Sequence, residues 1–371
     1  MPIPEQRNLE EARGILAKWL SEQLPGATDV EVGPIGGPAA TGFSNETLLF
    51  DASWKENGAP RTEPLVVRVK PVAHTVFLEA DFEYQYRVLS TLGPRTDVPV
   101  PNMRWYEADD TWLGAPFFVM DRVNGRAPSD SPPYTHEGWL LSEASPEQRR
   151  TLVESGLGAL AKVHAVDWRA LGFDFLDKPQ YGKLGFEQQL RYYEASFEWA
   201  KGGNPPPDVG VAALDWVRAH APGHDPEITL CWGDARINNQ LFGPDYCVAA
   251  VVDWEMVTLA DPMMDLGWWL FLDRFFHEAQ LATRMEGFPT REEMTAYYEQ
   301  VSGRTARDLE FYEIFAGLRF TVVMMRLAEL FFEFDLVDRE QSTETARNNP
   351  VTRATADLLG IPAPGEPTAG Y

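Results

Sequence analysis

The spacing of apolar residues is mostly β-like in the first third of this chain and mostly helical after it, and that change limits the folds open to the chain. After a helical segment at 9–23, residues 30–123 show short β-like runs around one helical segment, 78–92. After residue 145 helical spacing dominates, in segments 146–166, 185–202, 211–220, 263–283, 290–302 and 306–336. These patterns predict an α+β protein in which a small mixed unit precedes a larger helical one.

The apolar run Pro116–Met120 is the last β-like segment of the first part, and a Pro-rich stretch at 126–139 follows it. We therefore predict two domains, 1–123 with its leading helix and 124–371. A β-rich lobe, an apolar connector and a helical lobe, in this order, first suggest a bilobal kinase.

Charge and cysteine content exclude several classes of protein. The chain has 371 residues with 32 Lys plus Arg and 56 Asp plus Glu, a net charge of -24. This acidic balance argues against a nucleic-acid partner. The apolar stretch 311–334 carries five charged residues, so we expect a buried helix there and no membrane association. Without a signal-like N-terminus, and with Cys231 and Cys247 predicted to be small buried residues, we expect a cytoplasmic protein.

The chemically informative segment is 229–255, in which two short β-like runs bracket a polar turn. The turn carries Asp234, Arg236 and Asn239, and the second run leads to Asp253. Carboxylate and amide oxygens at the ends of two neighbouring strands suit a hard cation such as Mg²⁺. Phosphoryl transfer uses such a set: a carboxylate that orients a hydroxyl, oxygen ligands for the metal and a cation near the transferred group.

With these residues in place, the sequence resembles the aminoglycoside phosphotransferase and choline kinase-like small-molecule kinases. Their His-Gly-Asp-x-x-x-x-Asn loop appears here as residues 232–239, with Trp232 in place of His, which we expect to remove a polar group from behind the loop. The Asp-Pro-x-x-Asp-Leu motif appears at 261–266, and Leu-Gly-x-Pro-Phe-Phe-x-Met at 113–120. The resemblance covers about 30–340 and implies a protein kinase-like fold that uses ATP and Mg²⁺.

By this resemblance Asp234 is the catalytic residue that accepts or orients the hydroxyl proton, and Asn239 and Asp253 are the magnesium ligands. Arg236 stands where related loops carry a cation near the γ-phosphate. A capped turn is the alternative for Asp234 and Asn239, and an ion pair with a loop carboxylate is the alternative for Arg236.

Nucleotide-binding residues in the first domain also follow from the resemblance. Ser44 and Asn45 match a turn that covers the nucleotide, although an ordinary hairpin would explain them too. Arg68 and Lys70 share one face of a strand; Arg68 aligns best with the family's phosphate-binding Lys, Lys70 is the substitute, and solvated edge cations are the alternative. The segment with Met120, Asp121 and Val123 resembles the hinge whose backbone meets adenine, or is a core strand.

The predicted function is transfer of the γ-phosphoryl group of ATP to a hydroxyl of a small molecule. The acceptor is either an aminoglycoside-like antibiotic or a hydroxyacyl-CoA-like metabolite, because the chain also resembles kinase domains associated with acyl-CoA dehydrogenases. Aromatic residues between 134 and 200 favour a less polar acceptor. A pseudokinase with a regulatory role is the alternative, suggested by Trp232 and by Gln85, which stands where many relatives carry Glu.

Overall fold

The computed structural model describes residues 7–37, 45–72, 74–79, 81–223 and 227–366. The chain divides into two compact units. The first comprises Met1–Val76, Phe82–Pro94 and Pro101–Val123; the second comprises Phe77–Asp81, Arg95–Val100 and Asn124–Tyr371. The predicted α+β class, with a small β-rich part and a larger helical part, is confirmed. The short segments 77–81 and 95–100 join the second unit, which apolar spacing does not reveal.

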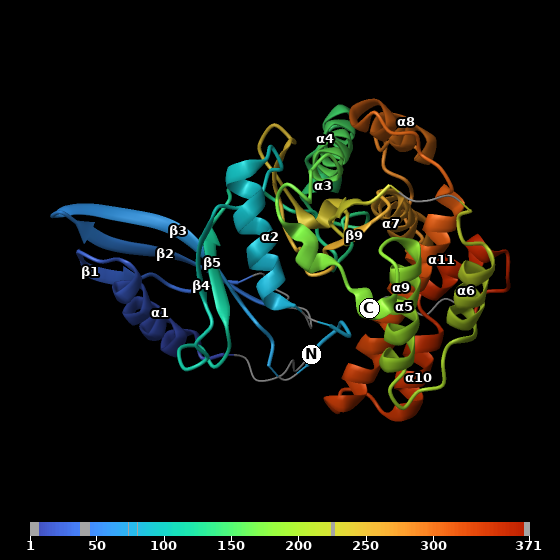
Figure 1. The fold of residues 1–371 in the computed structure, drawn as a ribbon, viewed down its shortest axis with the longest axis horizontal. Helices are drawn as coiled ribbons and strands as arrows, with labels where there is room; N and C mark the ends of the chain where they lie inside the picture. Colours follow the sequence, from blue (N-terminus) through green and yellow to red (C-terminus); the bar gives the residue numbers. More distant parts are fainter. Residues whose placement is uncertain (1–6, 38–44, 73, 80, 224–226, 367–371) are drawn as a thin grey trace. The chain divides into compact units, whose positions relative to one another are not determined.

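The first unit is one antiparallel sheet with two helices (Figure 1). One helix precedes the first strand along the chain, and the other lies between the third and the fourth strand. The strand order is β1-β2-β3-β5-β4. The sequence pattern missed β4, whose residues are all only half-buried. The elements are α1 (Leu9–Gln23), β1 (Ala27–Val32), β2 (Glu46–Glu56), β3 (Ala59–Val69), α2 (Phe82–Arg95), β4 (Met103–Glu107) and β5 (Phe117–Asp121).

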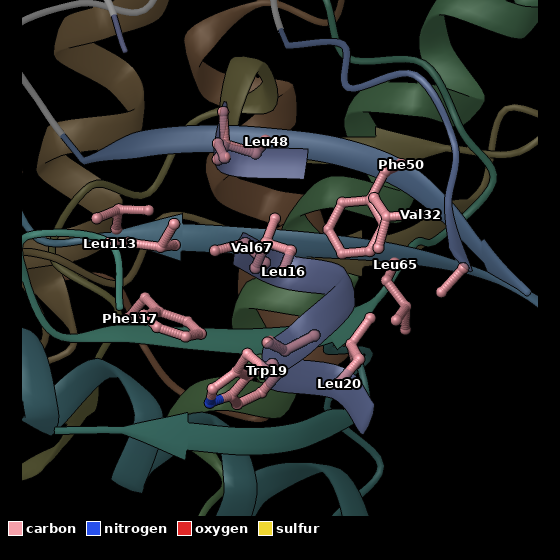
Figure 2. Close-up of a cluster of buried hydrophobic side chains, with 14 of the residues drawn as sticks. Leu16, Trp19, Leu20, Val32, Leu48, Phe50, Leu65, Val67, Leu113 and Phe117 are labelled. Atoms are coloured by element: carbon pink, nitrogen blue, oxygen red, sulfur yellow. The ribbon is translucent and has the colours of Figure 1, made fainter. Parts of the chain in front are cut away.

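Strand alternation divides the core of this unit into two faces. On one face Leu65 and Val67 of β3 pack with Leu16 and Trp19 of α1 (Figure 2). The other face holds a smaller cluster of Val66, Phe118 and Met120 from the sheet and Phe82 from α2. Arg68 follows Val66 by two residues in β3, so it lies on the α2 face.

The second unit is mostly helical, with two small two-stranded sheets. Strand β6 pairs with β9 and β7 pairs with β8, so the two strands expected to be neighbours belong to different sheets. The elements are α3 (Trp139–Ser142), α4 (Pro146–His164), α5 (Phe186–Ala200), α6 (Asp208–Ala219), β6 (Thr229–Cys231), β7 (Gln240–Phe242), β8 (Val248–Val251), β9 (Thr258–Ala260), α7 (Met263–Arg274), α8 (Arg291–Ser302), α9 (Leu309–Glu333), α10 (Arg339–Arg347) and α11 (Pro350–Leu359).

Helices α7 and α9 form the centre of the helical part and pack on each other. Both are buried on nearly every side, which is typical of a core helix. Gly267 of α7 allows a close approach, because a Cβ atom there would lie 2.6 Å from the Cβ of Tyr312 on α9. Among the helices of the described residues, none combines the length and the apolar character that crossing a bilayer requires.

Candidate active site

The polar turn at 232–239 joins β6 to β7 by a sharp bend at Gly233. Gly233 has φ of 91°, and a Cβ atom there would lie 2.0 Å from the carbonyl oxygen of Met256. Only glycine fits this conformation and this space. The chain then forms a short 3-10 turn at Ile237–Asn239 before β7 begins.

Asp265 of α7 anchors the start of this turn. Its carboxylate accepts hydrogen bonds from the backbone N–H groups of Trp232 at 2.7 Å and Gly233 at 2.9 Å. The Nε2 atom of His164 lies 3.2 Å from the same carboxylate, and Nδ1 lies 2.7 Å from the hydroxyl of Tyr298. With Nε2 as the donor to the carboxylate, Nδ1 accepts from the hydroxyl of Tyr298. His164 is therefore a hydrogen-bonded core residue, as its apolar sequence neighbours suggest.

The carboxylate of Asp234 is held at both oxygens. Trp268 Nε1 donates to Oδ1 at 2.8 Å, and Asn239 Nδ2 donates to Oδ2 at 2.7 Å. Arg236 Nε lies 3.1 Å from Oδ1. The side chain of Asp234 is 17% exposed. It is thus oriented by fixed donors and still open to a ligand, which is the arrangement that a catalytic carboxylate requires.

Arg236 bridges two carboxylates, because its Nη1 also lies 2.6 Å from Asp130. Burial lowers the pKa of the Arg236 guanidinium, but the attraction of Asp130, Asp234 and Asp253 outweighs burial and raises it. The ion pair with a loop carboxylate, left open by the sequence, is therefore present. The same loop is held by Asn238, whose Nδ2 donates to the carbonyl of Ser129 at 3.2 Å.

Asn239 and Asp253 come together through the β7–β8 hairpin. The N–H of Val252 donates to the carbonyl of Asn239 at 2.9 Å, which places Asp253 directly beyond this pair. Asn239 uses its amide nitrogen on Asp234, so its amide oxygen points elsewhere. An amide oxygen and a carboxylate on adjacent strand ends are ligands that Mg²⁺ accepts, so these residues fit that metal.

Trp232 supports Asp253 from behind the turn. Its buried indole Nε1 lies 3.0 Å from the carbonyl oxygens of both Val252 and Asp253. The expectation that Trp232 removes a polar group from this place is therefore wrong, because the indole N–H supplies a donor there. Asp253 has φ of 60°, a strained conformation for a residue with a side chain. The hydrogen bond from Trp232 to the Asp253 carbonyl therefore helps to hold the residue in this conformation.

Arg319 of α9 reaches the turn from the opposite side and is 1% exposed. Its Nη2 donates to the carbonyl of Gly233 at 2.7 Å, and its Nε donates to the hydroxyl of Tyr193 at 3.0 Å. The guanidinium also lies over the ring of Trp268, 4.4 Å from its centroid. Sequence spacing did not single out Arg319, Trp268 or Asp130. The ring of Trp268 is buried, as expected of an indole in an almost wholly buried helix.

A hollow that is partly open to solvent lies beside the loop that follows Asp253, and it encloses about 480 Å³ when the solvent space at its mouth is included. Its polar wall includes an ion pair of 2.8 Å between Glu79 and Lys178. Burial raises the pKa of Glu79, but hydrogen bonds from Lys178 and Tyr181 outweigh burial and lower it; burial and Glu79 together raise the pKa of Tyr181 to about 12. The lining is Phe77, Glu79, Lys178, Gln188, Gln189, Tyr192, Tyr193, Glu255, Met256, Val257 and Thr258.

Aromatic residues between 134 and 200 are divided between this hollow and the core. Tyr192 and Tyr193 line the hollow, whereas Tyr134 and Phe197 are buried in the core. Tyr134 packs against Phe276. Some aromatic residues of this stretch are therefore core residues. The aromatic content is thus weaker evidence for a less polar acceptor than the sequence alone suggests.

In the first unit, Ser44 lies outside the described residues. Asn45 is buried and donates from Nδ2 to Oε1 of Gln85 at 3.4 Å. Arg68 is half-buried in β3, opposite Thr47 of β2 and Phe118 of β5. Gln85 of α2 and Asn45, just before β2, therefore form an amide pair. Glu79 forms an ion pair with Lys178.

The segment compared with a kinase hinge is the end of β5. Met120 is buried between β3 and β4. Asp121 is engaged through its backbone and its side chain. Its N–H donates to the carbonyl of Asn102 at 2.9 Å, and its carboxylate lies 2.5 Å from Arg104 Nε and accepts from Asn102 Nδ2 at 2.9 Å. The N–H of Val123 has no acceptor among the described residues, so it is more available to a ligand than the N–H of Asp121. Lys70 is exposed just beyond the end of β3.

The two cysteines differ in a way that contradicts the sequence prediction. Cys231 of β6 is buried, but Cys247 lies in the β7–β8 turn and is exposed. Burial raises the pKa of the Cys231 thiol. We expect Ellman's reagent to modify only Cys247 in the folded protein and both thiols in denaturant. Modification of Cys231 at the rate of Cys247 under native conditions would contradict the burial of β6.

A model of the phosphotransferase enzyme family matches residues 38–297. Among curated proteins, the chain is 28% identical over 232 residues to the probable acyl-CoA dehydrogenase IBR3 of Arabidopsis thaliana, covering 61% of this chain and 26% of that protein. It is 25% identical over 307 residues to acyl-CoA dehydrogenase family member 10 of Mus musculus, covering 79% and 27%. The chain thus spans about a quarter of each relative.

Solved structures share the fold. A putative aminoglycoside phosphotransferase from Ralstonia eutropha JMP134 has a TM-score of 0.66 and 26% identity, covering 94% of this chain and 98% of that one. A thermostable mutant of aminoglycoside phosphotransferase APH(4)-Ia, in ternary complex with ADP and hygromycin B, has a TM-score of 0.53 and 16% identity, covering 92% and 99%. The predicted kinase-like fold is confirmed.

Proposed function

Because the chain belongs to the phosphotransferase enzyme family and is an enzyme of the small-molecule kinase type, we propose that it transfers the γ-phosphoryl group of ATP to a hydroxyl of a small acceptor with the help of Mg²⁺. The observation that carries the proposal is the carboxylate of Asp234, held at both oxygens by Trp268 and Asn239. Asn239 and Asp253 would hold the metal, and Arg68, Lys70 and Asn45 would contact the nucleotide. Ser44 and the backbone of Met120, Asp121 and Val123 remain proposed nucleotide contacts, with Val123 favoured.

In the proposed reaction Asp234 takes the proton of the acceptor hydroxyl as that oxygen bonds to the γ-phosphorus. The bond between this phosphorus and the bridging oxygen to the β-phosphate breaks, and ADP leaves. Bound Mg²⁺ would neutralise charge on the phosphate oxygens. Arg236 holds Asp234 and Asp130 together, and we propose that it adds positive charge near the transferred group.

We propose the hollow beside Glu255–Thr258 as the acceptor pocket and a hydroxyacyl thioester of coenzyme A as the acceptor class. The names of the curated relatives support this class, since one is a probable acyl-CoA dehydrogenase and the other a member of the acyl-CoA dehydrogenase family. The hollow supports a mixed acceptor, because tyrosine rings and amide groups line it beside the Glu79–Lys178 ion pair.

Acceptor-dependent ADP release tests the proposal, with and without Mg²⁺, against hydroxyacyl-CoAs, aminoglycosides, macrolides, sugars and choline-like amines. We expect turnover with a hydroxyacyl-CoA that disappears when EDTA removes the metal. Turnover with an aminoglycoside alone would support the proposed kinase activity but contradict the proposed acceptor class. Nucleotide binding without turnover on any acceptor would favour the pseudokinase, and failure to bind MgATP would contradict the proposed nucleotide use.

A further inference from the structure

A buried cation lies directly behind Asp234 without a carboxylate to balance it. Arg319 is 1% exposed, and no described Asp or Glu forms an ion pair with it. Its Nη1 atom is buried and makes no hydrogen bond within the described part of the chain. Burying a charged group without an opposite charge is costly. We therefore expect either that other contacts compensate the charge or that the charge serves the function of the protein.

The compensating contacts of Arg319 all lead to the candidate active site. Nη2 donates to the carbonyl of Gly233, the residue before Asp234. The guanidinium lies 4.4 Å from the ring centroid of Trp268, whose Nε1 donates to Asp234. Nε donates to the hydroxyl of Tyr193, which lines the hollow proposed for the acceptor. The Arg319 side chain thus contacts the backbone next to Asp234, the indole that binds the Asp234 carboxylate, and a residue that lines the proposed acceptor pocket.

The Gly233 backbone is held from two helices at once. Asp265 of α7 accepts its N–H at 2.9 Å, and Arg319 of α9 donates to its carbonyl at 2.7 Å. A cation above the face of an indole draws electron density from the ring, so the N–H at the ring edge becomes a stronger donor. The contact of Arg319 with Trp268 therefore strengthens the hydrogen bond that fixes Oδ1 of Asp234.

We propose that Arg319 is a positioning residue for phosphoryl transfer: by clamping the Gly233 carbonyl and polarising the indole of Trp268, it holds the Asp234 carboxylate in the orientation that receives the acceptor proton. The proposal rests on the proposed function. It assigns to Arg319 an effect on the chemical step rather than on substrate binding.

Arg319→Met tests this, with Arg326→Met as the matched control. Arg326 is also on α9, and its guanidinium also lies over an indole, 4.8 Å from the ring centroid of Trp199, but it pairs with Glu333 away from the turn. We expect Arg319→Met to lower kcat by about 10- to 100-fold with both KM values within about threefold, and Arg319→Lys to recover part of the loss. Arg326→Met should leave kcat within about twofold.

The indole ¹H–¹⁵N resonance of Trp268, assigned by its loss in Trp268→Phe, gives a readout that needs no activity. A weaker hydrogen bond moves the N–H proton upfield, so we expect an upfield shift in Arg319→Met and none in Arg326→Met. An unmoved resonance together with an unchanged kcat would overturn the proposal, as would a loss confined to KM.

The two readouts separate failure of this proposal from failure of the proposed function. If the wild-type protein turns over no acceptor, the proposed function fails, and the resonance still reports whether Arg319 acts on Trp268. If Arg319→Met does not fold, Arg319→Gln, which is also uncharged, is judged by the same criteria. A folded Arg319→Gln with wild-type kcat and an unmoved resonance would limit Arg319 to a structural role and overturn the proposal.

Discussion

Asp234→Asn is expected to lower kcat by about 10²- to 10⁴-fold, the range that general acid–base catalysis contributes. The amide keeps the size of the carboxylate but cannot take up the proton of the acceptor hydroxyl. Because Asp234 is proposed to act in the chemical step, the Kd of MgATP should change by less than about threefold. Single-turnover kinetics and nucleotide titration measure the two quantities separately.

Asp110→Asn is the matched control for this substitution. Asp110 lies in the exposed loop after β4 of the first unit and makes no hydrogen bond with other described residues. It should leave both kcat and the Kd of MgATP at wild-type values. If Asp234→Asn retained more than about a tenth of the wild-type kcat, the general-base role of Asp234 would be wrong. A rise in Kd with unchanged kcat would instead assign Asp234 to binding.

The local part of the candidate site follows from sequence spacing because few residues separate its members. Asp234 and Asn239 lie five residues apart in one turn, so a local bend of the chain is enough to bring their side chains together. Asp253 follows a short apolar run that pairs with the strand after Asn239, and hairpin register brings the two together. The pattern of polar residues after apolar runs therefore predicts which of these side chains lie close together.

The supports of that site did not follow from spacing, because they come from helices far along the chain. Trp268 lies in an almost wholly buried helix, where an indole is expected to be core, and only the fold shows its N–H at Asp234. Arg319 is one of several charged residues in an otherwise apolar helix, a pattern equally typical of a charge that extends to solvent. Tertiary packing, which spacing does not encode, decides between these interpretations.

Three elements of the fold did not follow from apolar spacing: strand β4 and helices α10 and α11. The residues of β4 are all only half-buried, and the buried positions of α10 and α11 include polar residues such as Ser342 and Thr355. Helix α10 buries only Ser342 and Ala346, and its start is set by Asp338, whose side chain accepts from the backbone N–H of Gln341 at 2.8 Å. Helix α11 begins with Asn349 followed by Pro350, a capping signal that the apolar spacing does not include. Capping residues would have located both helices.

The largest loss of stability is expected at Asp265, because its carboxylate satisfies three buried donors at once. Asp265→Ala leaves the N–H groups of Trp232 and Gly233 and Nε2 of His164 without an acceptor. An unsatisfied buried donor costs about 1–3 kcal/mol, and the three share one site, so their costs do not add in full. We expect the free energy of unfolding to fall by about 3–5 kcal/mol, as when one member of a buried charged network is removed.

Guanidinium titration followed by circular dichroism measures this loss, with Asp357→Ala as the control. Asp357 is 72% exposed and lies 2.7 Å from Arg274, so removing this surface pair should cost less than about 1 kcal/mol. Asp265→Asn should lie between the two, because its amide keeps one acceptor oxygen but places an NH₂ group toward another donor. If Asp265→Ala were no less stable than Asp357→Ala, the turn at Gly233 would have to be held by Arg319 and by the contact of Gly233 with Met256, and the anchoring role of Asp265 would be wrong.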